Sequence, residues 1–417
     1  MAEAEVEVVV QIAGEDLLAG RLWSHRRRGI ESATFSYTPE YVAHDDAYEL
    51  DPMLRLSVGA QQTPGDHAMF AAFSDCAPDR WGRRLIAWSA FGEQDAQRSF
   101  GEIDYLLGVR DDLRQGALRF RDPVAGRYLA EEATGVPALV ELSALLGAAE
   151  RLERDEASED ELRALLRGGS SLGGARPKAH VLDSTGNIAI AKFPSNASDR
   201  WDVIRWEAVA LQLARAARIR VGDSTLHVID EKPVLIVDRF DRNGALRIGY
   251  VSAMTMLEVS DGARGSYLEM ADVIERHSPN AREDLRELWR RIAFSILICN
   301  TDDHLRNHGF LRTSSAGWTL SPAFDLNPDP SPGLKRLSTA IDLDDTTASV
   351  TTLMNVASYF RLDGEAARQV LAEVIAAVGK WRTIAERVGL ARAVVEQMAP
   401  AFEHEQATQA RELVDAL

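Results

Sequence analysis

Hydrophobic and polar positions divide the chain into a strand-rich beginning and a helix-rich end. Three early segments have the length, the β-branched residues and the alternation of strands: Val6–Ile12, Leu17–Trp23 and Ala33–Tyr37. Gly14 and a basic loop, Ser24–Gly29, are expected to separate these strands, because glycine and clustered polar residues favour turns. Residues 1 to about 125 are therefore predicted to form a β-rich subdomain.

The rest of the chain changes to helical spacing. Two short strands are predicted at Ala179–Leu182 and Asn187–Ala191, followed by a helix at Trp201–Ala217. The segment Lys232–Arg242 is predicted to be a buried strand that runs into a polar turn. Beyond Tyr250 the predicted helices are Tyr267–His277, Ala281–Cys299, Val350–Phe360, Gly364–Val378 and Ala391–Leu417. The pattern predicts an α+β protein with a mixed middle region, residues 126–242, and a helical end, residues 243–417.

Composition excludes some functional classes. The chain has 47 Lys and Arg against 64 Asp and Glu residues, a formal net charge of −17, so phosphate backbones repel it and unaided nucleic-acid binding is disfavoured. Cys76 and Cys299 lack metal-ligand spacing and suit a reducing cytoplasm. Without a basic-then-apolar leader or an apolar run of spanning length, we expect a cytoplasmic protein with no membrane contact.

The densest polar segment, Asn300–Phe310, directly follows an apolar helix. Burying ionisable and amide side chains is costly unless they are paired, bound to metal or facing a polar cleft, so this segment predicts a site. Asp302 and Asn307 lie five residues apart, and Asp325 follows later. Protein kinases use residues of this order and spacing to position the acceptor hydroxyl and hold Mg²⁺. A capped helix end with a solvated loop is the alternative.

A glycine-rich segment, Gly168–Lys178, contains Gly173 and Gly174 and allows backbone N–H groups to approach an anion. It is neither a P-loop nor a G-x-G-x-x-G fingerprint, and alone it would equally suit a linker. Lys192 closes the next apolar strand, where kinases place a phosphate-binding lysine. Glu207 borders the apolar face of the following helix, so a Lys192–Glu207 ion pair is predicted.

Five motifs in this order resemble the HipA family of bacterial toxin kinases: Ser170–Ala179, Lys192–Pro194, Asp238–Arg242, Asn300–Asn307 and Phe324–Asp325. The resemblance covers nearly the whole chain. It implies a protein-kinase-like/phosphatidylinositol-kinase-like two-lobed fold, with the family's N-terminal β subdomain at residues 1–125. Residues 126–242 would be the N-lobe-like region and residues 243–417 an all-helical C-terminal lobe.

The resemblance also implies residue roles. Asp302 is the expected catalytic aspartate, with Asn307 and Asp325 as Mg²⁺ ligands. The residues expected to bind ATP are Gly173, Gly174, Lys192 with its partner Glu207, and the backbone of Asp238 and Phe240. Ser171 falls on the family's autophosphorylated serine, and the adjacent Ser170 leaves the modified position open.

Substrates and partners follow from the same resemblance. It implies a growth-inhibiting, ATP- and Mg²⁺-dependent kinase that phosphorylates Ser or Thr of a cellular protein, typically an aminoacyl-tRNA synthetase. A HipB-like helix-turn-helix antitoxin is the expected partner, and DNA would be contacted only through it. The segment Ile248–Leu257 differs from that of the founding member, which leaves the substrate open.

Two other classes stay open. A small-molecule phosphotransferase would use the same Lys192, Asp302, Asn307 and Asp325, because phosphoryl transfer needs the same charges whatever the size of the acceptor. A non-enzymatic corepressor that acts with a DNA-binding antitoxin would predict degraded site residues, whereas the motifs here are intact.

Overall fold

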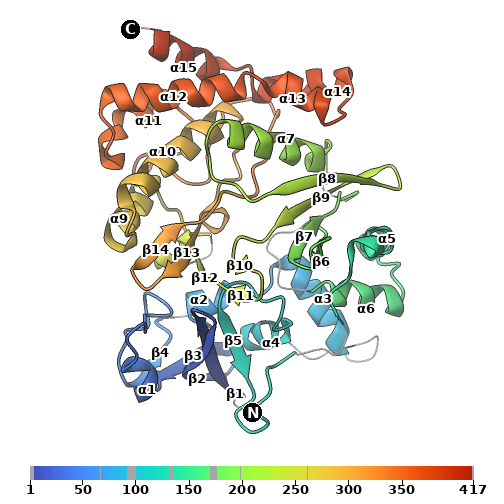
Figure 1. Ribbon diagram of the computed structural model, residues 1–417, viewed down its shortest axis with the longest axis vertical. Coiled ribbons are helices and arrows are strands. Elements are labelled where there is room, and N and C mark those ends of the chain that lie inside the picture. The colour runs from blue at the N-terminus through green and yellow to red at the C-terminus, as the bar shows by residue number, and fades with distance from the viewer. Residues whose placement is uncertain are drawn as a thin grey trace. The chain divides into compact units, whose positions relative to one another are not determined.

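The computed structural model describes residues 4–65, 67–91, 100–130, 135–169, 176–197, 199–260 and 262–415, apart from the side chains of residues 88–91. Over these ranges the chain forms two compact units (Figure 1). Unit 1 comprises residues 1–199 and 228–251, and unit 2 comprises residues 200–227 and 252–417.

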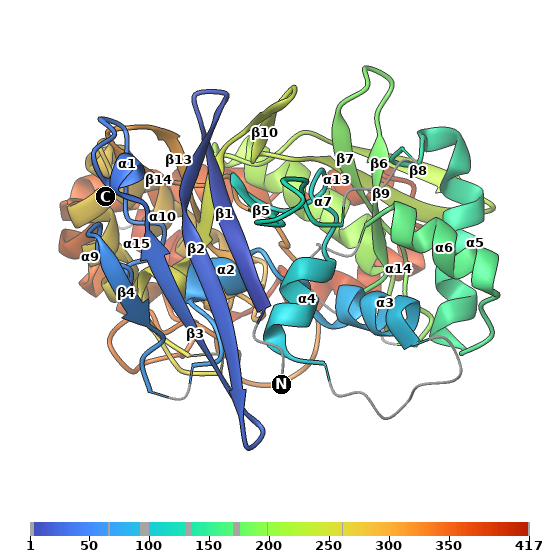
Figure 2. The ribbon, with the colours of Figure 1, turned by 90° about the horizontal axis from the view of Figure 1, so that it is seen from below.

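The first part of unit 1 is an antiparallel sheet with the strand order β4-β3-β2-β1-β5. Its strands are β1 (Ala4–Ile12), β2 (Glu15–Arg27), β3 (Ile30–Tyr37), β4 (Gly59–Gln62) and β5 (Leu118–Arg121). Three short helices accompany it: α1 (Pro39–Val42), α2 (Ala71–Ser74) and α4 (Glu102–Gly108). Figure 2 shows β1, β2 and β3 side by side, which confirms the β-rich beginning predicted from the alternating pattern.

The predicted basic loop at Ser24–Gly29 is wrong. Strand β2 continues through most of this segment, because its polar residues find cross-strand partners on β3, among them Glu31 opposite Arg26. The turn itself is only Arg28 (φ +52°) and Gly29 (φ +83°). Two consecutive left-handed residues are what a tight type I′ hairpin turn requires.

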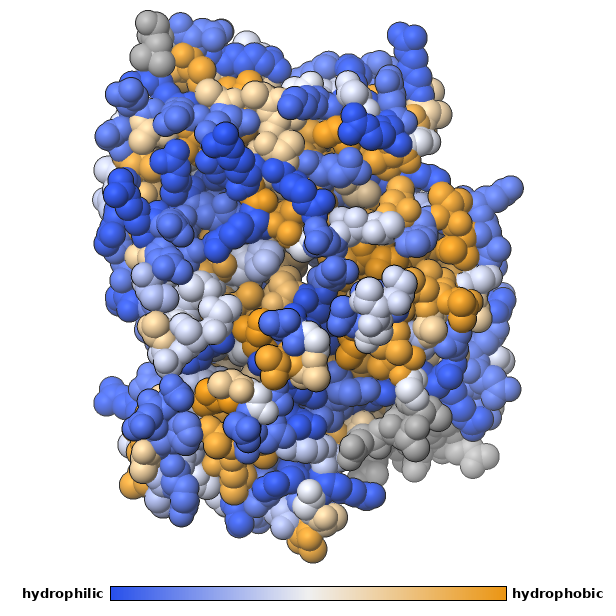
Figure 3. Space-filling view, in the orientation of Figure 1, coloured by the Kyte–Doolittle hydropathy of each residue, from blue (hydrophilic) through white to orange (hydrophobic). Residues whose placement is uncertain are grey.

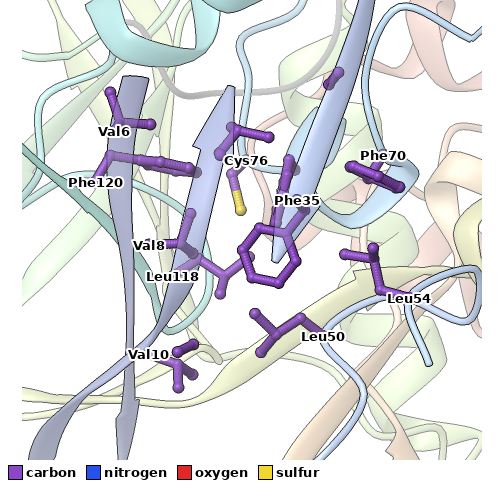
Figure 4. Packing of buried hydrophobic residues seen from close by; sticks show 14 of the residues in the cluster. Val6, Val8, Val10, Phe35, Leu50, Leu54, Phe70, Cys76, Leu118 and Phe120 are labelled. Atoms are coloured by element: carbon purple, nitrogen blue, oxygen red, sulfur yellow. The ribbon is translucent and has the colours of Figure 1, made fainter. Parts of the chain in front are cut away.

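The core of this part lies against one face of the sheet. Alternate residues of β1, namely Val6, Val8 and Val10, join Phe35 of β3 and residues of the short helices (Figure 4). Phe35 packs edge-on against Phe73 of α2 at 5.5 Å between ring centroids. Alternate residues of β1 therefore face this core, while Glu7 and Val9 on the other face of the strand are buried as well.

The second part of unit 1 is a smaller antiparallel sheet with its own core. Strands β6 (Lys178–Leu182), β7 (Ile188–Lys192) and β9 (Lys232–Asp238) pair in that order, and β8 (Ser224–Ile229), whose last two residues belong to unit 1, follows β9. Helices α3 (Arg80–Phe91), α5 (Leu142–Glu153) and α6 (Glu159–Arg167) contribute to its core. The two predicted short strands are confirmed to within about a residue, and the strand predicted within Lys232–Arg242 ends at Asp238.

Short elements complete unit 1: η2 (Leu139–Glu141), β10 (Arg242–Asn243), β11 (Leu246–Arg247) and most of β12 (Gly249–Ser252). Apolar side chains gather over α5 and the neighbouring strands on the face drawn in Figure 3. Trp81 and Leu85 of α3 join the second core although they precede residue 126. The predicted boundaries near residues 125 and 242 stay predictions.

Unit 2 is mainly helical and carries one hairpin in its described part, β13 (Gly309–Ser314) with β14 (Gly317–Leu320). Its helices are α7 (Val203–Ala216), α8 (Ala253–Met256), α9 (Tyr267–His277), α10 (Ala281–Leu297), α11 (Val350–Asn355), α12 (Gly364–Val378), α13 (Trp381–Arg387), α14 (Arg392–Met398) and α15 (Glu405–Asp415). Single-turn helices are η3 (Leu305–Asn307), η4 (Ala357–Phe360) and η5 (Ala399–Ala401). Helices α9 and α12 match their predicted bounds.

The continuous helix predicted over Ala391–Leu417 is wrong. The chain forms α14, the single turn η5 around Pro400, and α15 instead. Proline has no N–H to donate and clashes with the preceding turn, so the helix breaks there. Within the described ranges, no helix of either unit combines the length and apolar character that a membrane crossing requires.

Candidate active site

The segment Asn300–His308, here called the catalytic loop, begins where α10 ends. Helix α10 is held in the interior of unit 2 by fully buried side chains such as Trp289. Cys299 then adopts φ +51°, which ends the helical path and turns the chain. Asn300 is buried, and its Oδ1 accepts the N–H of Asn327 at 3.2 Å. The predicted polar segment is therefore anchored at its first residue.

Asp302 and Asn307 are in direct contact within this loop. The Asn307 Nδ2 donates to the main-chain oxygen of Asp302 at 2.7 Å. Because an amide nitrogen cannot ligate a cation, this bond leaves Oδ1 as the side-chain atom that could bind a metal and directs it away from that carbonyl. The Asp302 side chain is 69% exposed, and His304 Nε2 lies 3.8 Å from its Oδ1. An exposed carboxylate on an ordered backbone suits a group that must meet an incoming hydroxyl.

Asp303, which is not among the residues predicted from the sequence, is the structural centre of the loop. Its side chain is 1% exposed and accepts hydrogen bonds from the Tyr267 hydroxyl and from the N–H of Ser338, the latter at 2.7 Å. Its main-chain oxygen accepts from Thr339 Oγ1 at 2.7 Å and from His308 Nε2 at 3.2 Å. In the sequence, the hint at this role was the position of Asp303 next to the predicted catalytic residue Asp302; its burial becomes visible only in the structure.

Burial perturbs the ionisation of this cluster. It raises the pKa of Asp303 to about 7 and lowers the pKa of His308 to about 3. It also raises the pKa of Tyr267 well above the usual value, with the neighbouring Asp303 acting in the same direction. Each shift favours the neutral form, as desolvation requires.

Asp325, the second predicted metal ligand, has a strained backbone. Its φ of +58° lies in the left-handed region, which is uncommon for residues other than glycine. The Asn327 Nδ2 donates to its main-chain oxygen at 3.2 Å and so supports this turn. Strain of this kind persists where surrounding structure imposes it, and it concentrates at functional sites.

The two segments that carry the predicted metal ligands are neighbours. Asn307 and Phe324, the residue before Asp325, line the same cavity of about 20 Å³, together with Asp303. A cavity of this size has room for about one water molecule. The sequence order Asp302, Asn307, Asp325 thus corresponds to adjoining segments of unit 2.

Unit 1 carries the predicted phosphate-binding lysine, and a second lysine faces it. Lys192 ends β7 directly opposite Lys178, the first residue of β6. Directly opposed residues share one face of an antiparallel sheet, and like charges there repel each other. Lys178 is buried and Lys192 is half-buried. The strand register, unknown from sequence, thus sets a second lysine directly opposite the predicted phosphate-binding one.

The Asp238–Arg242 motif does more than end β9. Arg239 donates two hydrogen bonds to Asp241, at 2.9 and 2.6 Å, and one to Leu113 O at 2.7 Å. Asp241 also accepts the Gly116 N–H at 2.7 Å. Arg239 and Asp241 are buried, and Asp238, predicted to contact adenine through its backbone, is exposed at the strand end. The motif's side chains therefore hold unit 1 together around the predicted adenine segment.

His180 connects this motif to the start of the glycine-rich segment. It is fully buried; its Nε2 lies 3.0 Å from Arg239 Nη1 and its Nδ1 lies 3.0 Å from Gly168 O. Because arginine only donates, Nε2 accepts and Nδ1–H donates to Gly168. Burial, reinforced by Arg239, lowers the pKa of His180 well below its usual value. Gly169 has φ +82°, and a Cβ there would meet Leu113 at 2.4 Å.

Other predicted site residues lie outside the described part or in different units. Ser170, Ser171, Gly173 and Gly174 fall outside the described residues. Glu207 is a buried residue of α7 in unit 2, whereas Lys192 belongs to unit 1, so their pairing stays a prediction. The residues predicted to bind ATP are mainly in unit 1, and those predicted for catalysis and metal binding are in unit 2.

The donor set fits Mg²⁺ bound together with a nucleotide. Asn307 Oδ1 and the Asp325 carboxylate are oxygen donors, which Mg²⁺ prefers, and Mg²⁺ takes most other ligands from water and phosphates. Across the described ranges, no group of three or more His, Cys, Asp or Glu side chains is arranged around a metal position. The residues thus suit a substrate-bound metal rather than an all-protein cage.

Comparison with known families decides the relationship. Residues 170–382, about half of the chain, match the family described as HipA-like C-terminal domain. The chain belongs to this HipA-like family. The matched range begins at the glycine-rich segment and includes Lys192, the Asp238–Arg242 motif, the catalytic loop and Asp325.

A solved structure shows the same fold. The HipA-like chain matches a chain of the Shewanella oneidensis MR-1 toxin–antitoxin complex of HipA, HipB and operator DNA with a TM-score of 0.68 and 16% identity, covering 98% of this chain and 99% of that chain. At this identity the match establishes fold alone. The predicted α+β, kinase-like fold class, with a β-rich N-terminal region and a helical C-terminal part, is confirmed, although hairpin β13–β14 interrupts the helices.

One curated relative is named "Putative kinase" and comes from Haemophilus influenzae. It is 37% identical over 60 residues, which is 14% of this chain. The match spans 18% of the length of that relative, so its name describes that protein and not this one.

Proposed function

We propose that the chain is an ATP- and Mg²⁺-dependent serine/threonine protein kinase of the toxin type. The observation that carries the proposal is the Asn307 Nδ2 to Asp302 O hydrogen bond of 2.7 Å beside an exposed Asp302 carboxylate. It supports a division of labour in which Asp302 meets the acceptor hydroxyl and Asn307 Oδ1 faces a metal. Membership of the HipA-like family supports the same assignment.

In this proposal Asp302 accepts the proton of the acceptor hydroxyl as it attacks the γ-phosphate of ATP, and ADP leaves. Mg²⁺, when bound, neutralises developing charge on the phosphates, with Asn307 and Asp325 as its protein ligands. The strained φ of Asp325 and the cavity shared by Asn307 and Phe324 support adjoining ligands. Most of the rate enhancement would come from position and charge.

Residues of unit 1 would bind the nucleotide. Lys192 would bind the ATP phosphates, with Lys178 directly opposite it on β6. The backbone of Asp238 and Phe240 would hold adenine, and Gly173 and Gly174 would approach the phosphates. Glu207 would pair with Lys192.

Acceptor and partner are proposed by class. We propose that the chain phosphorylates Ser or Thr of a cellular protein, such as an aminoacyl-tRNA synthetase, and modifies Ser171 or Ser170 of its own glycine-rich segment. A phosphate there would be repelled by the ATP phosphates and would lower nucleotide affinity. The HipA, HipB and DNA complex of Shewanella supports a HipB-like antitoxin as the partner, with DNA contacted through it.

Phosphate transfer from radiolabelled Mg-ATP to the chain itself tests the proposal. Asp302→Asn keeps the shape of the side chain but removes the proton acceptor, so transfer should fall about 10²–10⁴-fold. Mass spectrometry should locate the phosphate on Ser170 or Ser171 in the wild type and not in the variant. Asp325→Asn should instead weaken Mg²⁺-dependent ATP binding, measured by calorimetry.

Asp344→Asn is the matched control, because Asp344 is an exposed aspartate of unit 2 outside the proposed site. It should transfer phosphate at the wild-type rate. Wild-type transfer by Asp302→Asn would overturn the assignment, and ATP binding without any transfer to protein would favour a small-molecule acceptor.

A further inference from the structure

Asp302 is held in place by the residues on either side of it. Its carboxylate is largely exposed, so the position of that group depends on the backbone. On one side, the main-chain oxygen of Thr301 accepts the Ser338 hydroxyl at 2.8 Å. On the other, the Asp303 carboxylate accepts the Ser338 N–H at 2.7 Å. One residue of a distant segment, Ser338, therefore contacts both neighbours of Asp302.

Asp303 ties three segments of unit 2 together. Its carboxylate joins the catalytic loop to α9 through Tyr267 and to Ser338. The segment around Ser338 is docked on α9 independently, since Ala340 O accepts the Tyr267 N–H at 2.8 Å and Ala340 N donates to Gly265 O at 2.9 Å. Hydrogen bonds consequently connect the catalytic loop, the start of α9 and the segment around Ser338 to one another.

We propose that Asp303 is a positioning residue for Asp302, acting through Ser338 and Tyr267. The inference rests on the proposed kinase function and extends it, because it names the group that orders the catalytic aspartate. It also gives the segment Leu337–Ile341, which lies beyond the predicted metal ligand, a direct influence on the reaction through Ser338.

Asp284 provides a control that separates the stability of unit 2 from the order of the catalytic loop. Asp284 of α10 is a second buried aspartate: it is 0% exposed and accepts from Ser278 Oγ at 2.7 Å and from Leu320 N at 3.0 Å. It also pairs with Arg220 at 2.6 Å, and these partners, which lie before α10, on β14 and at Arg220, are all outside the catalytic loop. Loss of Asp284 should therefore lower the stability of unit 2 without changing the position of Asp302.

The effect expected of Asp303 is on turnover. A displacement of about 1 Å at a reacting group reduces rates by about 10²-fold, so Asp303→Ala should lower kcat by about 10- to 100-fold. The affinity for Mg-ATP should fall much less than kcat, because Asn307 and Asp325 keep their side chains and the residues proposed to bind the nucleotide are mainly in unit 1. Asp303→Asn should restore most of kcat, since its Oδ1 accepts the Ser338 N–H and its Nδ2 donates to the Tyr267 oxygen.

Phosphate transfer from radiolabelled Mg-ATP to the chain itself, whose first-order rate constant serves as kcat, should be measured on the full chain. Mg-ATP calorimetry and amide hydrogen exchange of residues 301–308 complete the set. Asp303→Ala should lower kcat and the exchange protection of the loop, whereas Asp284→Ala should lower the melting temperature and leave both unchanged. Tyr267→Phe and Ser338→Ala each remove one hydroxyl and serve if Asp303→Ala fails to fold. Each should lower kcat less than Asp303→Ala.

Wild-type kcat in Asp303→Ala, or in both hydroxyl variants, would overturn the positioning role. So would a parallel loss of kcat and ATP affinity that Asp303→Asn fails to restore, because that would indicate only general loosening. If the wild type transfers no phosphate, the proposed kinase function fails by itself; unchanged loop protection in the variants would then overturn the positioning role separately.

Discussion

Asp241 in unit 1 and Asp303 in unit 2 are both buried aspartates beside predicted site segments, yet their surroundings are opposite. Asp241 faces two guanidinium groups, Arg239 at 2.6 Å and Arg242 at 2.8 Å. Asp303 receives hydrogen bonds from two neutral donors, the Tyr267 hydroxyl and the Ser338 N–H. Asp241 is part of an ionic cluster, whereas Asp303 is held by uncharged hydrogen-bond donors.

The two environments move the two pKa values in opposite directions. Burial acts to raise the pKa of Asp241, but Arg239 and Arg242 outweigh it and lower that pKa. Burial prevails at Asp303 and raises its pKa to about 7. A buried carboxylate next to a site can therefore stay charged in an ion pair, when its donors are guanidinium groups, or favour the neutral form and hold a loop in place, when its donors are uncharged.

The largest effect is expected from breaking the ionic cluster. Asp241→Ala would leave Arg239 and Arg242 buried without their carboxylate, so the free energy of unfolding should fall by about 3–5 kcal/mol. Urea denaturation followed by circular dichroism measures this. Glu159→Ala is the control, because Glu159 pairs with Arg163 on the surface, where both side chains are about two-thirds exposed, and its loss should cost about 0–1 kcal/mol. Equal losses in both variants would contradict the distinction.

Asp303→Asn should separate the two aspartates by pH. With a pKa of about 7 in the folded protein and 3.8 ordinarily, Asp303 keeps a proton that the unfolded chain has already released. Its contribution to stability is therefore complete below pH about 4 and is lost as the pH rises through about 7. Asparagine does not titrate, so the free energy of unfolding of the variant, relative to that of the wild type, should rise by on the order of 4 kcal/mol between pH 4 and 7.

Asp241→Asn is the counterpart. The pKa of Asp241 lies below 3.8 in the folded protein, so its contribution is complete above pH about 4 and is lost only at lower pH. The difference between this variant and the wild type should stay constant from pH 5 to 7. Burial also lowers the pKa values of His180 and His308, which makes the free energy of unfolding rise with pH, opposite to the effect of Asp303. Both histidines are present in the wild type and in each variant, so their contribution cancels in the difference between the two. A constant difference for Asp303→Asn over the same range would refute the contrast.

The smallest effect tests how tightly unit 1 holds the start of the glycine-rich segment. Gly169 and Gly186 both have left-handed φ, +82° and +85°, but a Cβ at Gly169 would lie 2.4 Å from Leu113 and 3.0 Å from His180, whereas Gly186 has open space. Gly186→Ala should cost about 1 kcal/mol of backbone strain, and Gly169→Ala about 1–3 kcal/mol more through overpacking. Thermal unfolding of the two variants measures both losses of stability. Equal losses would mean that the residues around Gly169 move aside at little cost.

Local pattern determined much of this protein. Strands β1, β3, β6, β7 and β9 were predictable from short runs of apolar and β-branched residues, and helices α9 and α12 from apolar residues at period 3.6, because both patterns lie in neighbouring residues. The spacing of Asp302 and Asn307 was equally local, and their contact follows from one tight turn between them. The order of motifs was enough to indicate the HipA-like family.

Long-range partner choice was decided only by the tertiary structure. Ser338 meets Asp303 across 35 residues, and Gly116 meets Asp241 across 125, so no local pattern encodes either contact. The strand register that sets Lys178 opposite Lys192 likewise depends on packing, because a shift by one residue would turn one of them to the other face. Local spacing therefore determined which residues could do the chemistry, and folding decided which buried groups hold them in place, since desolvated polar atoms accept only the partners that packing brings to them.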